Sequence, residues 1–117
     1  MLVFLSHRRL KPGSYDRYRE AWEPEVVPED ILREEIYHAR SLENPDEVIS
    51  FGIMDISRDE IPKMREAFGG EEAEARRQAR MAEVVEWTGI DAIFEVVEEL
   101  RIDDREVPSQ SSPSSGA

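Results

Sequence analysis

The sequence contains no cysteine, and this absence excludes several classes of functional site. Without thiols the chain has no disulfide, no thiolate metal ligand and no cysteine nucleophile. Histidine is nearly as scarce, because His7 and His38 are the two histidines among 117 residues. They do not form the HxH or HExxH spacing that is typical of a zinc site, so we expect no metal centre.

Long apolar runs are also missing from the sequence. No stretch approaches the ~20 residues that a membrane-spanning helix needs. The four apolar residues after Met1 are too few for the apolar region of a signal peptide, so we expect a cytoplasmic protein without a membrane partner. Basic residues are in the minority, with 15 against 27 acidic residues and a net charge of −12. Such a chain repels phosphate backbones, and we therefore expect no nucleic-acid partner.

The length and composition favour one globular domain followed by a tail. Apolar residues make up 39% and charged residues 36% of the chain, which suits a domain with a modest core. From residue 103 onward the sequence becomes rich in Ser and Pro and loses its apolar periodicity. We therefore predict a folded domain over 1–102 and a flexible tail over 103–117.

The apolar periodicity and the turn residues predict the order of the secondary-structure elements. The order is strand, helix, strand, strand, helices, strand, which predicts an α+β, ferredoxin-like βαββαβ domain with an antiparallel sheet. The second helical region begins at a cap formed by Ser57 or Asp59. The predicted ranges are a strand at 2–10, a helix from Ser14 onward, a hairpin over 36–55, helices over 57–68 and 71–87, and a strand at 91–100.

The predicted strands are apolar on both faces. In the first strand, Leu2 and Phe4 point to one side while Val3 and Leu5 point to the other. One face can pack on the helices, and the other needs a cover that this short chain does not supply. A second copy of the same sheet is the simplest cover, so we predict a homodimer.

The hairpin carries a polar pair, His38 and Arg40, which point to the same side of their strand. A three-residue loop places His38 opposite Gly52, and a four-residue loop places it opposite Ile53. A shift of one residue moves the whole set to the other face, and the sequence leaves both registers open. His38 is accordingly either part of a reaction centre or an ordinary hydrogen-bonded or solvent-facing residue.

Three stretches of the sequence resemble the dimeric α+β barrel superfamily, and in particular small proteins classed with the antibiotic biosynthesis monooxygenases. They are FLSHRRLKPGSYDRYREAW, YHARSLENPDEVISFGIMD and RQARMAEVV followed by DAIFEVVEEL, within residues 1–102. The resemblance implies two sheets packed face to face and a small pocket in each subunit between sheet and helices. It also implies cofactor-independent oxidation of a small aromatic or enolic molecule.

Oxidation of a phenol or enol without a cofactor needs a base to form the anion and a cation to stabilise it. The candidates for the base are His38 and His7, and the candidates for the cation are Arg40 and Arg8. The resemblance further implies that aromatic side chains line the pocket and bind the substrate. These candidates are Trp22, Tyr18, Tyr37, Phe51 and Phe68.

The sequence does not favour haem binding, which is a property of the haem-degrading members of this superfamily. Those relatives use a haem-ligating His on the later helices, whereas residues 57–87 contain no His. We therefore expect no cofactor. The alternative function is a non-catalytic dimeric module that binds a small molecule or serves in assembly, because a fold alone does not decide between the two.

Overall fold

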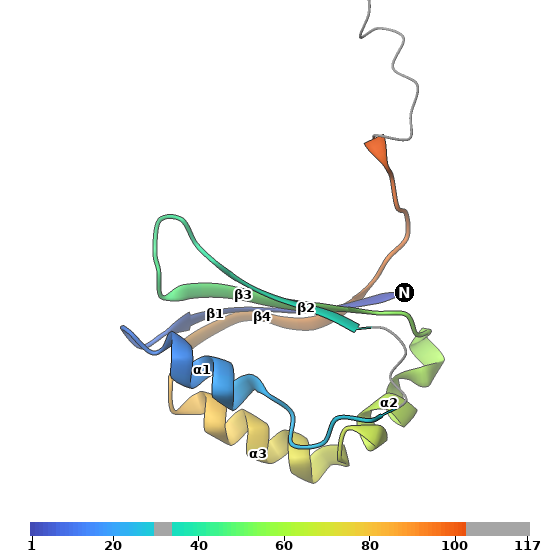
Figure 1. The fold of residues 1–117 in the computed structure, drawn as a ribbon, viewed down its shortest axis with the longest axis horizontal. Coiled ribbons are helices and arrows are strands. Elements are labelled where there is room, and N and C mark those ends of the chain that lie inside the picture. Colours follow the sequence, from blue (N-terminus) through green and yellow to red (C-terminus); the bar gives the residue numbers. More distant parts are fainter. Residues whose placement is uncertain (30–33, 103–117) are drawn as a thin grey trace, which may run out of the picture.

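The computed structural model describes residues 1–29 and 34–102. Within them, a four-stranded antiparallel sheet forms one layer and three α-helices lie on one of its faces (Figure 1). The strand order β2-β3-β1-β4 confirms the predicted ferredoxin-like α+β fold. The elements are β1 (Leu2–Leu10), α1 (Tyr15–Trp22), β2 (Glu34–Arg40), β3 (Glu47–Met54), the 3₁₀ helix η1 (Arg58–Glu60), α2 (Ile61–Ala67), α3 (Gly70–Ala82) and β4 (Val85–Glu95).

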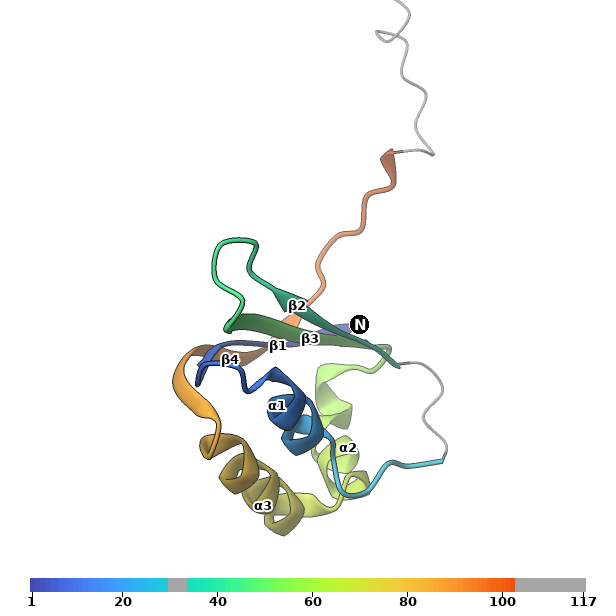
Figure 2. The same cartoon turned by 60° about the vertical axis from the view of Figure 1, so that its left-hand side comes forward.

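The helices stay on the same side of the sheet when the molecule is turned (Figure 2). We call the sheet face that they cover the inner face, and the opposite one the outer face. The tail predicted over 103–117 lies outside the described residues. None of the helices in the described part of the chain has the length and apolar character that crossing a lipid bilayer requires.

Helix α1 begins where its sequence predicts. Ser14 occupies the N-cap position, and its carbonyl accepts a hydrogen bond of 2.9 Å from the backbone N–H of Tyr18. The buried side chains of α1 are Tyr18 and Ala21, three residues apart and therefore on one face of the helix. This spacing directs Tyr18 toward the middle of the sheet.

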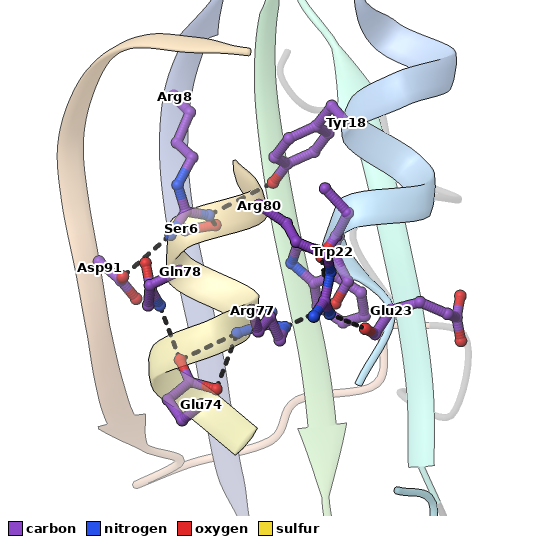
Figure 3. A network of polar contacts seen from close by, with 11 residues as sticks. Ser6, Arg8, Tyr18, Trp22, Glu23, Glu74, Arg77, Gln78, Arg80 and Asp91 are labelled. Atoms are coloured by element: carbon purple, nitrogen blue, oxygen red, sulfur yellow. Dashed lines mark hydrogen bonds and ion pairs between the residues drawn. The ribbon is translucent and has the colours of Figure 1, made fainter. Parts of the chain in front are cut away.

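The C-terminal end of α1 is held by two arginines from α3. The Nε atom of Arg77 donates to the carbonyl of Trp22 at 2.6 Å, and Nη2 of Arg80 donates to the carbonyl of Glu23 at 2.9 Å (Figure 3). A helix leaves its last carbonyls unpaired, and cations are favourable at that end of its dipole. The two helices are thereby fixed relative to each other above the sheet.

The β2–β3 hairpin has neither of the two registers that the sequence left open. His38 pairs with Ser50, rather than with Gly52 or Ile53. Ser50 lies two residues before Gly52, the partner that a three-residue loop gives His38. Because side chains alternate along a strand, a shift of two residues leaves His38 on the same face of the sheet. It therefore lies on the inner face of the sheet.

The wider loop of this hairpin is stabilised by bonds that a strand pattern does not reveal. The strands close where the backbone N–H of Ser41 donates to the carbonyl of Glu47 at 2.9 Å. Inside the loop, Ser41 Oγ accepts hydrogen bonds from the backbone N–H groups of Glu43 and Asn44. Such side-chain bonds to nearby backbone groups favour turns over a continued strand ladder.

The boundary between α3 and β4 differs from the sequence prediction. The helix ends at Ala82 instead of continuing to residue 87, and β4 starts at Val85 instead of at residue 91. The β-branched and aromatic residues over 84–88 explain the difference, because they favour strands over helices. Gly89 consequently lies within β4 and does not terminate a helix.

Gly89 forms part of an irregularity in the pairing of β1 with β4. His7 pairs with Ile90 and Arg8 pairs with Thr88, so Gly89 is the extra residue of a β-bulge. A Cβ atom at this position would lie 2.5 Å from the indole of Trp87. The absence of a side chain at Gly89 therefore leaves room for the indole ring of Trp87 to lie over the backbone of residue 89.

The apolar core fills one end of the layer between sheet and helices. Its buried members come from β1, β3, α1, α3 and the turn before β4, and they are Leu10, Tyr18, Ala21, Val48, Met81 and Val84. Helix α2 lies toward the other end and has no buried residue. The packing is therefore dense at one end and leaves space for a cavity at the other.

Candidate functional site

Polar residues form a continuous row across the middle of the inner face. In the sheet register His38 pairs with Ser50, Ser50 with Ser6, and Ser6 with Asp91, so that each of the four strands contributes one residue. Ser6 and Ser50 are only 6% and 2% exposed. Burying polar groups costs free energy unless they are hydrogen-bonded, and this row is correspondingly well connected.

Arg8, two residues along β1 from Ser6, is the centre of the polar network. Its side chain is 5% exposed and makes three bonds (Figure 3). Nη1 donates to Ser6 Oγ at 2.6 Å and to Tyr18 Oη at 3.3 Å, while Nη2 lies 2.9 Å from Oδ2 of Asp91. The buried guanidinium is therefore both paired with a charge and hydrogen-bonded, as a buried charge requires.

A chain of hydrogen bonds connects Arg8 to His38. Tyr18 Oη lies 2.8 Å from Ser50 Oγ, which lies 2.8 Å from His38 Nδ1. Because a guanidinium only donates, Tyr18 accepts from Arg8. The other two bonds can run in either direction, and with His38 Nδ1 unprotonated Tyr18 donates to Ser50 and Ser50 donates to His38. Every hydroxyl proton in this chain has an acceptor when all bonds run in that direction.

His38 lies among three aromatic rings supplied by α1. Its ring centroid is 4.9 Å from that of Trp22, 6.0 Å from Tyr18 and 6.4 Å from Tyr15, each in an edge-on arrangement. Nε2 is buried and has no hydrogen-bond partner among the residues that the structure describes. The imidazole is thus anchored by Nδ1 alone in an aromatic environment.

This environment keeps His38 in its neutral form. Burial is the main reason why the pKa of His38 lies below its ordinary value of 6.5, because it disfavours the charged imidazolium. The positive charges of Arg19 and Arg77 lower the pKa further, and the carboxylate of Glu23 opposes them. His38 is therefore available as a proton acceptor at neutral pH.

A cavity of about 800 Å³ opens between the inner face and helices α2 and α3. Its polar wall comes from the network, with Ser6, Arg8, Ser50 and Asp91 all on the lining. His38 lies behind Ser50 rather than on the wall itself. The apolar lining comes from the sheet and from α2 and its C-terminal end, and includes Phe4, Met54, Met64, Phe68 and Ile93.

Trp22 also lines the cavity, but one face of its ring is already covered. The guanidinium carbon of Arg77 lies 4.8 Å from the centroid of the indole, in a cation–π contact. Arg77 is held there by its bond to the Trp22 carbonyl and by Glu74 at 3.0 Å (Figure 3). A ligand therefore meets the exposed parts of Trp22, or it displaces Arg77.

The structure separates the two histidines. His7 lies on the outer face, where Nε2 is 2.7 Å from a carboxylate oxygen of Glu47 and the ring contacts Trp87 edge-on at 5.1 Å. The hydrogen bond from His7 is the main cause that lowers the pKa of Glu47. His7 and His38 therefore belong to different surfaces of the sheet and do not share one cavity.

The other candidate residues also divide between the two faces. Tyr37 and Phe51 lie on the outer face, stacked with ring centroids 5.0 Å apart. Arg40 lies over the ring of Tyr15 at 5.3 Å, away from the cavity lining. Phe68 lines the cavity together with Trp22, and Tyr18 lies in the hydrogen-bond network behind the wall.

Sequence reasoning did not single out Ser6, Ser50 or Asp91, and it named Arg8 only as an alternative to Arg40. One pattern in β1 carries part of this information. Ser6 and Arg8 alternate with outward-facing residues and share their face with Leu2, Phe4 and Leu10, which predicts polar groups in the middle of a buried face. For Ser50 and Asp91 the register of the sheet is needed.

The described residues contain no group of three or more His, Asp or Glu side chains that could hold a metal ion. The carboxylate of the polar row, Asp91, is paired with Arg8. His38 and Asp91 lie on the two edge strands, at opposite ends of the row.

Comparisons with known proteins place the fold. No protein-family model matches the sequence, and no curated protein matches it. Among solved structures, the chain is similar to a protein from Chloroflexus aurantiacus J-10-fl that is provisionally assigned as an antibiotic biosynthesis monooxygenase. The TM-score is 0.58 with 13% sequence identity, over 86% of this chain and 97% of that one. At this identity the similarity shows a shared fold.

Proposed function

We propose that the chain is a cofactor-independent oxygenase that acts on a small aromatic or enolic molecule bound in the inner-face cavity. The observation that carries this proposal is the hydrogen-bonded pair of Ser50 and His38, which connects the cavity wall to a neutral imidazole at 2.8 Å. Buried polar groups that break the apolar pattern of a domain are expected mainly at functional sites. The fold shared with a protein assigned as a monooxygenase supports the same reaction class.

In this proposal His38 acts as the base through Ser50. The hydroxyl of a bound phenol or enol gives its proton to Ser50 Oγ, while the proton of Ser50 passes to His38 Nδ1. The resulting anion is stabilised by the guanidinium of Arg8, whose position is fixed by Ser6 and Tyr18. Preorganised charge in a site that excludes water is an effective way to stabilise an anionic intermediate. Arg8 therefore replaces Arg40 as the candidate for the stabilising cation, because Arg40 lies away from the cavity lining.

The substrate must supply the electrons, because no external reductant enters the scheme. A methylene group conjugated with the phenol or enol reacts with one O₂ once the anion has formed. One oxygen atom becomes the new carbonyl oxygen and the other leaves as water, so that R₂CH₂ and O₂ give R₂C=O and H₂O. The apolar walls formed by Phe4, Met54 and Phe68 suit the flat body of such a molecule.

The two histidines supply a matched test of this proposal. We expect oxygen uptake with a panel of hydroxylated aromatic methylene compounds to be strongly reduced by His38→Gln and by Ser50→Ala. His7→Gln, on the outer face, is the control and is expected to keep the wild-type rate. Equal rates for His38→Gln and the wild type would exclude the proposed base.

A second candidate function is a non-catalytic module that binds the same kind of molecule. The position of His38 behind Ser50, off the cavity wall, is the observation that favours it. This candidate predicts saturable binding by calorimetry with no oxygen uptake for any compound that binds. Binding accompanied by consumption of one O₂ per product excludes it.

The outer face supports a proposal on assembly, with a second copy of this chain as its occupant. Apolar side chains cover this face in register across the strands, and Tyr37, Ile49, Ile90 and Phe94 are each 41–50% exposed in the single chain. A face of this kind on all four strands suits a symmetric, self-complementary contact. Sedimentation equilibrium at several concentrations measures the mass directly, and a monomer throughout the range would exclude the homodimer.

A further inference from the structure

Tyr18 has an environment that its role as a core residue does not explain. The side chain is 0% exposed, yet its hydroxyl group lies in the middle of the hydrogen-bond chain instead of facing water. A buried tyrosine needs one partner for its hydroxyl, and this one has two. Arg8 donates to its oxygen, and Ser50 accepts its proton and passes the connection on to His38.

The ring of Tyr18 also belongs to a cluster of oxidisable side chains around His38. Its centroid is 6.0 Å from that of His38 and 6.5 Å from that of Tyr15. Trp22, which lines the cavity, also meets the imidazole edge-on, with ring centroids 4.9 Å apart. Tyr15 is partly exposed, so the cluster extends from the cavity wall to the surface of the protein.

We infer that Tyr18 is a redox-active tyrosine, which loses an electron to an oxidising radical in the cavity and its phenolic proton to the Ser50–His38 pair. A phenol is oxidised easily only when its proton has an acceptor, because the phenol radical cation is a very strong acid. Ser50 supplies this acceptor at 2.8 Å, and the proton of Ser50 moves on to His38 Nδ1. Arg8 continues to donate to the phenolic oxygen throughout.

The oxidant is an organic peroxyl radical. It forms when the substrate anion gives one electron to O₂, which leaves as superoxide, and a second O₂ adds to the resulting carbon radical. The source of this radical rests on the proposed oxygenase function, whereas the redox property of Tyr18 does not. One electron moves from Tyr18 to the peroxyl radical and gives a peroxide anion, and the phenolic proton reaches His38 through Ser50. The peroxide anion recovers a proton from His38 along the same path. In sum, Tyr18–OH and ROO• give Tyr18–O• and ROOH.

The partly exposed Tyr15 carries the radical from Tyr18 to the surface of the protein. An electron from Tyr15 reduces the radical of Tyr18 across a centroid distance of 6.5 Å. Tyr15 loses its proton to solvent, and a proton from water in the cavity returns to Tyr18 through Ser50, which restores the phenol and moves the radical to a ring that solvent reaches. A thiol in solution then gives a hydrogen atom to Tyr15 and becomes a thiyl radical. The cluster thereby removes the oxidising radical from the cavity before it oxidises Met54 and Met64 on the cavity wall to the sulfoxide.

The test generates the oxidant by light and therefore needs no substrate. The full chain is oxidised with photogenerated tris(bipyridine)ruthenium(III), and the radical is followed by electron paramagnetic resonance after rapid freezing. We expect a tyrosyl signal in the double variant Tyr15→Phe/Tyr37→Phe, in which Tyr18 is the one tyrosine left. A further Tyr18→Phe substitution is expected to abolish this signal, and Ser50→Ala is expected to slow its formation several-fold. Tyr15→Phe/Tyr18→Phe, which keeps Tyr37 on the outer face, is the matched control, and its signal is expected to form at the same rate with and without Ser50→Ala.

Two results would overturn the inference. One is the absence of a tyrosyl signal in Tyr15→Phe/Tyr37→Phe, and the other is a signal in that variant that forms at the same rate with and without Ser50→Ala. In case Tyr18→Phe does not fold, spin trapping followed by mass spectrometry locates the radical in the wild type, and an adduct confined to Tyr37 counts against Tyr18. Failure of the oxygenase proposal leaves this photochemical result unaffected, so the two outcomes are distinguishable.

Discussion

In the middle of the β-sheet the two faces partly reverse the distribution of polar and apolar residues that a small domain is expected to have, whereas the ends of the inner face are apolar and buried at Leu2, Leu10, Val48 and Met54. The inner face is covered by helices, yet its middle consists of Ser6, Arg8 and Ser50, none more than 6% exposed. The outer face is uncovered in the single chain, yet it presents Phe94 at 50% and Tyr37 at 47% exposure. In a one-sided antiparallel sheet the covered face is normally apolar and the other polar.

This reversal teaches that neither face is arranged for the stability of the single chain alone. Polar groups under the helices lose hydration, and apolar groups on the outer face gain nothing from solvent. We propose a small ligand for the inner face and a second copy of the chain for the outer face.

The largest expected effect comes from removing the buried cation of the inner face. Arg8→Met is predicted to lower oxygen uptake by about 10²–10³-fold, because the anion loses its main stabilising charge. Stability should also fall, by about 1–3 kcal/mol, because Ser6, Tyr18 and Asp91 each lose a bond to Arg8. Steady-state rates and urea unfolding measure the two effects. Arg40→Met is the control outside the cavity, and an equal loss in both variants would contradict the assignment.

The second largest expected effect comes from a substitution on the outer face. Phe94→Glu places a charge on the apolar outer face, at the edge strand β4, and is predicted to weaken dimerisation by about 30-fold, as expected for a contact worth about 2 kcal/mol. Analytical ultracentrifugation measures the change. Leu42→Glu, at a fully exposed position of the hairpin loop, should leave the mass distribution as it is. Dissociation by both variants alike would point to a non-specific effect of charge.

Tyr18→Phe tests the inner network through stability. The substitution keeps the ring but removes one hydrogen-bond partner from Ser50, which retains His38, and one from Arg8, which retains Ser6 and Asp91. We therefore expect a loss of about 1–3 kcal/mol in the free energy of unfolding. Tyr37→Phe removes a hydroxyl from the outer face and is expected to change that free energy by less than about 0.5 kcal/mol. Urea denaturation of both variants gives the comparison, and similar losses would show that the inner hydroxyl has no special role.

The smallest expected effect is a pH dependence of stability that comes from His38. Its pKa in the folded chain lies below 6.5, so the unfolded chain binds more protons when the pH falls through that value. Stability conferred by the neutral imidazole is therefore present above pH 6.5 and is lost as the pH decreases toward the folded pKa. Urea midpoints for the wild type and His38→Gln should converge on acidification. Parallel curves at all pH values would contradict the lowered pKa.

The fold was predictable because its signals are local. The turn before Ser14 and the spacing of Tyr15, Tyr18 and Trp22 define α1, and the element order defines the ferredoxin-like topology. The extent of β4 was not predictable. Strong helix formers up to residue 82 are followed almost at once by β-branched residues, and Gly89 forms a β-bulge instead of terminating a helix.

The site was only partly predictable because it depends on register. His38 was identified as a candidate, but its partner Ser50 follows from a five-residue loop that side-chain bonds of Ser41 stabilise. His7 and His38 are chemically equivalent in the sequence, and only the pairing of the strands places them on opposite faces. Asp91 reaches Arg8 across β1 and β4, a contact that no spacing in the chain reveals.

The most direct test of the central claim is an NMR titration of His38 and His7, with and without a panel of hydroxylated aromatic compounds. The claim is that the inner face holds a ligand site whose neutral base is His38. It predicts that His38 titrates below 6.5 and that its resonances shift when a ligand binds, while the resonances of His7 do not respond to the ligand. A His38 that titrates as a free imidazole and ignores every compound would contradict the account.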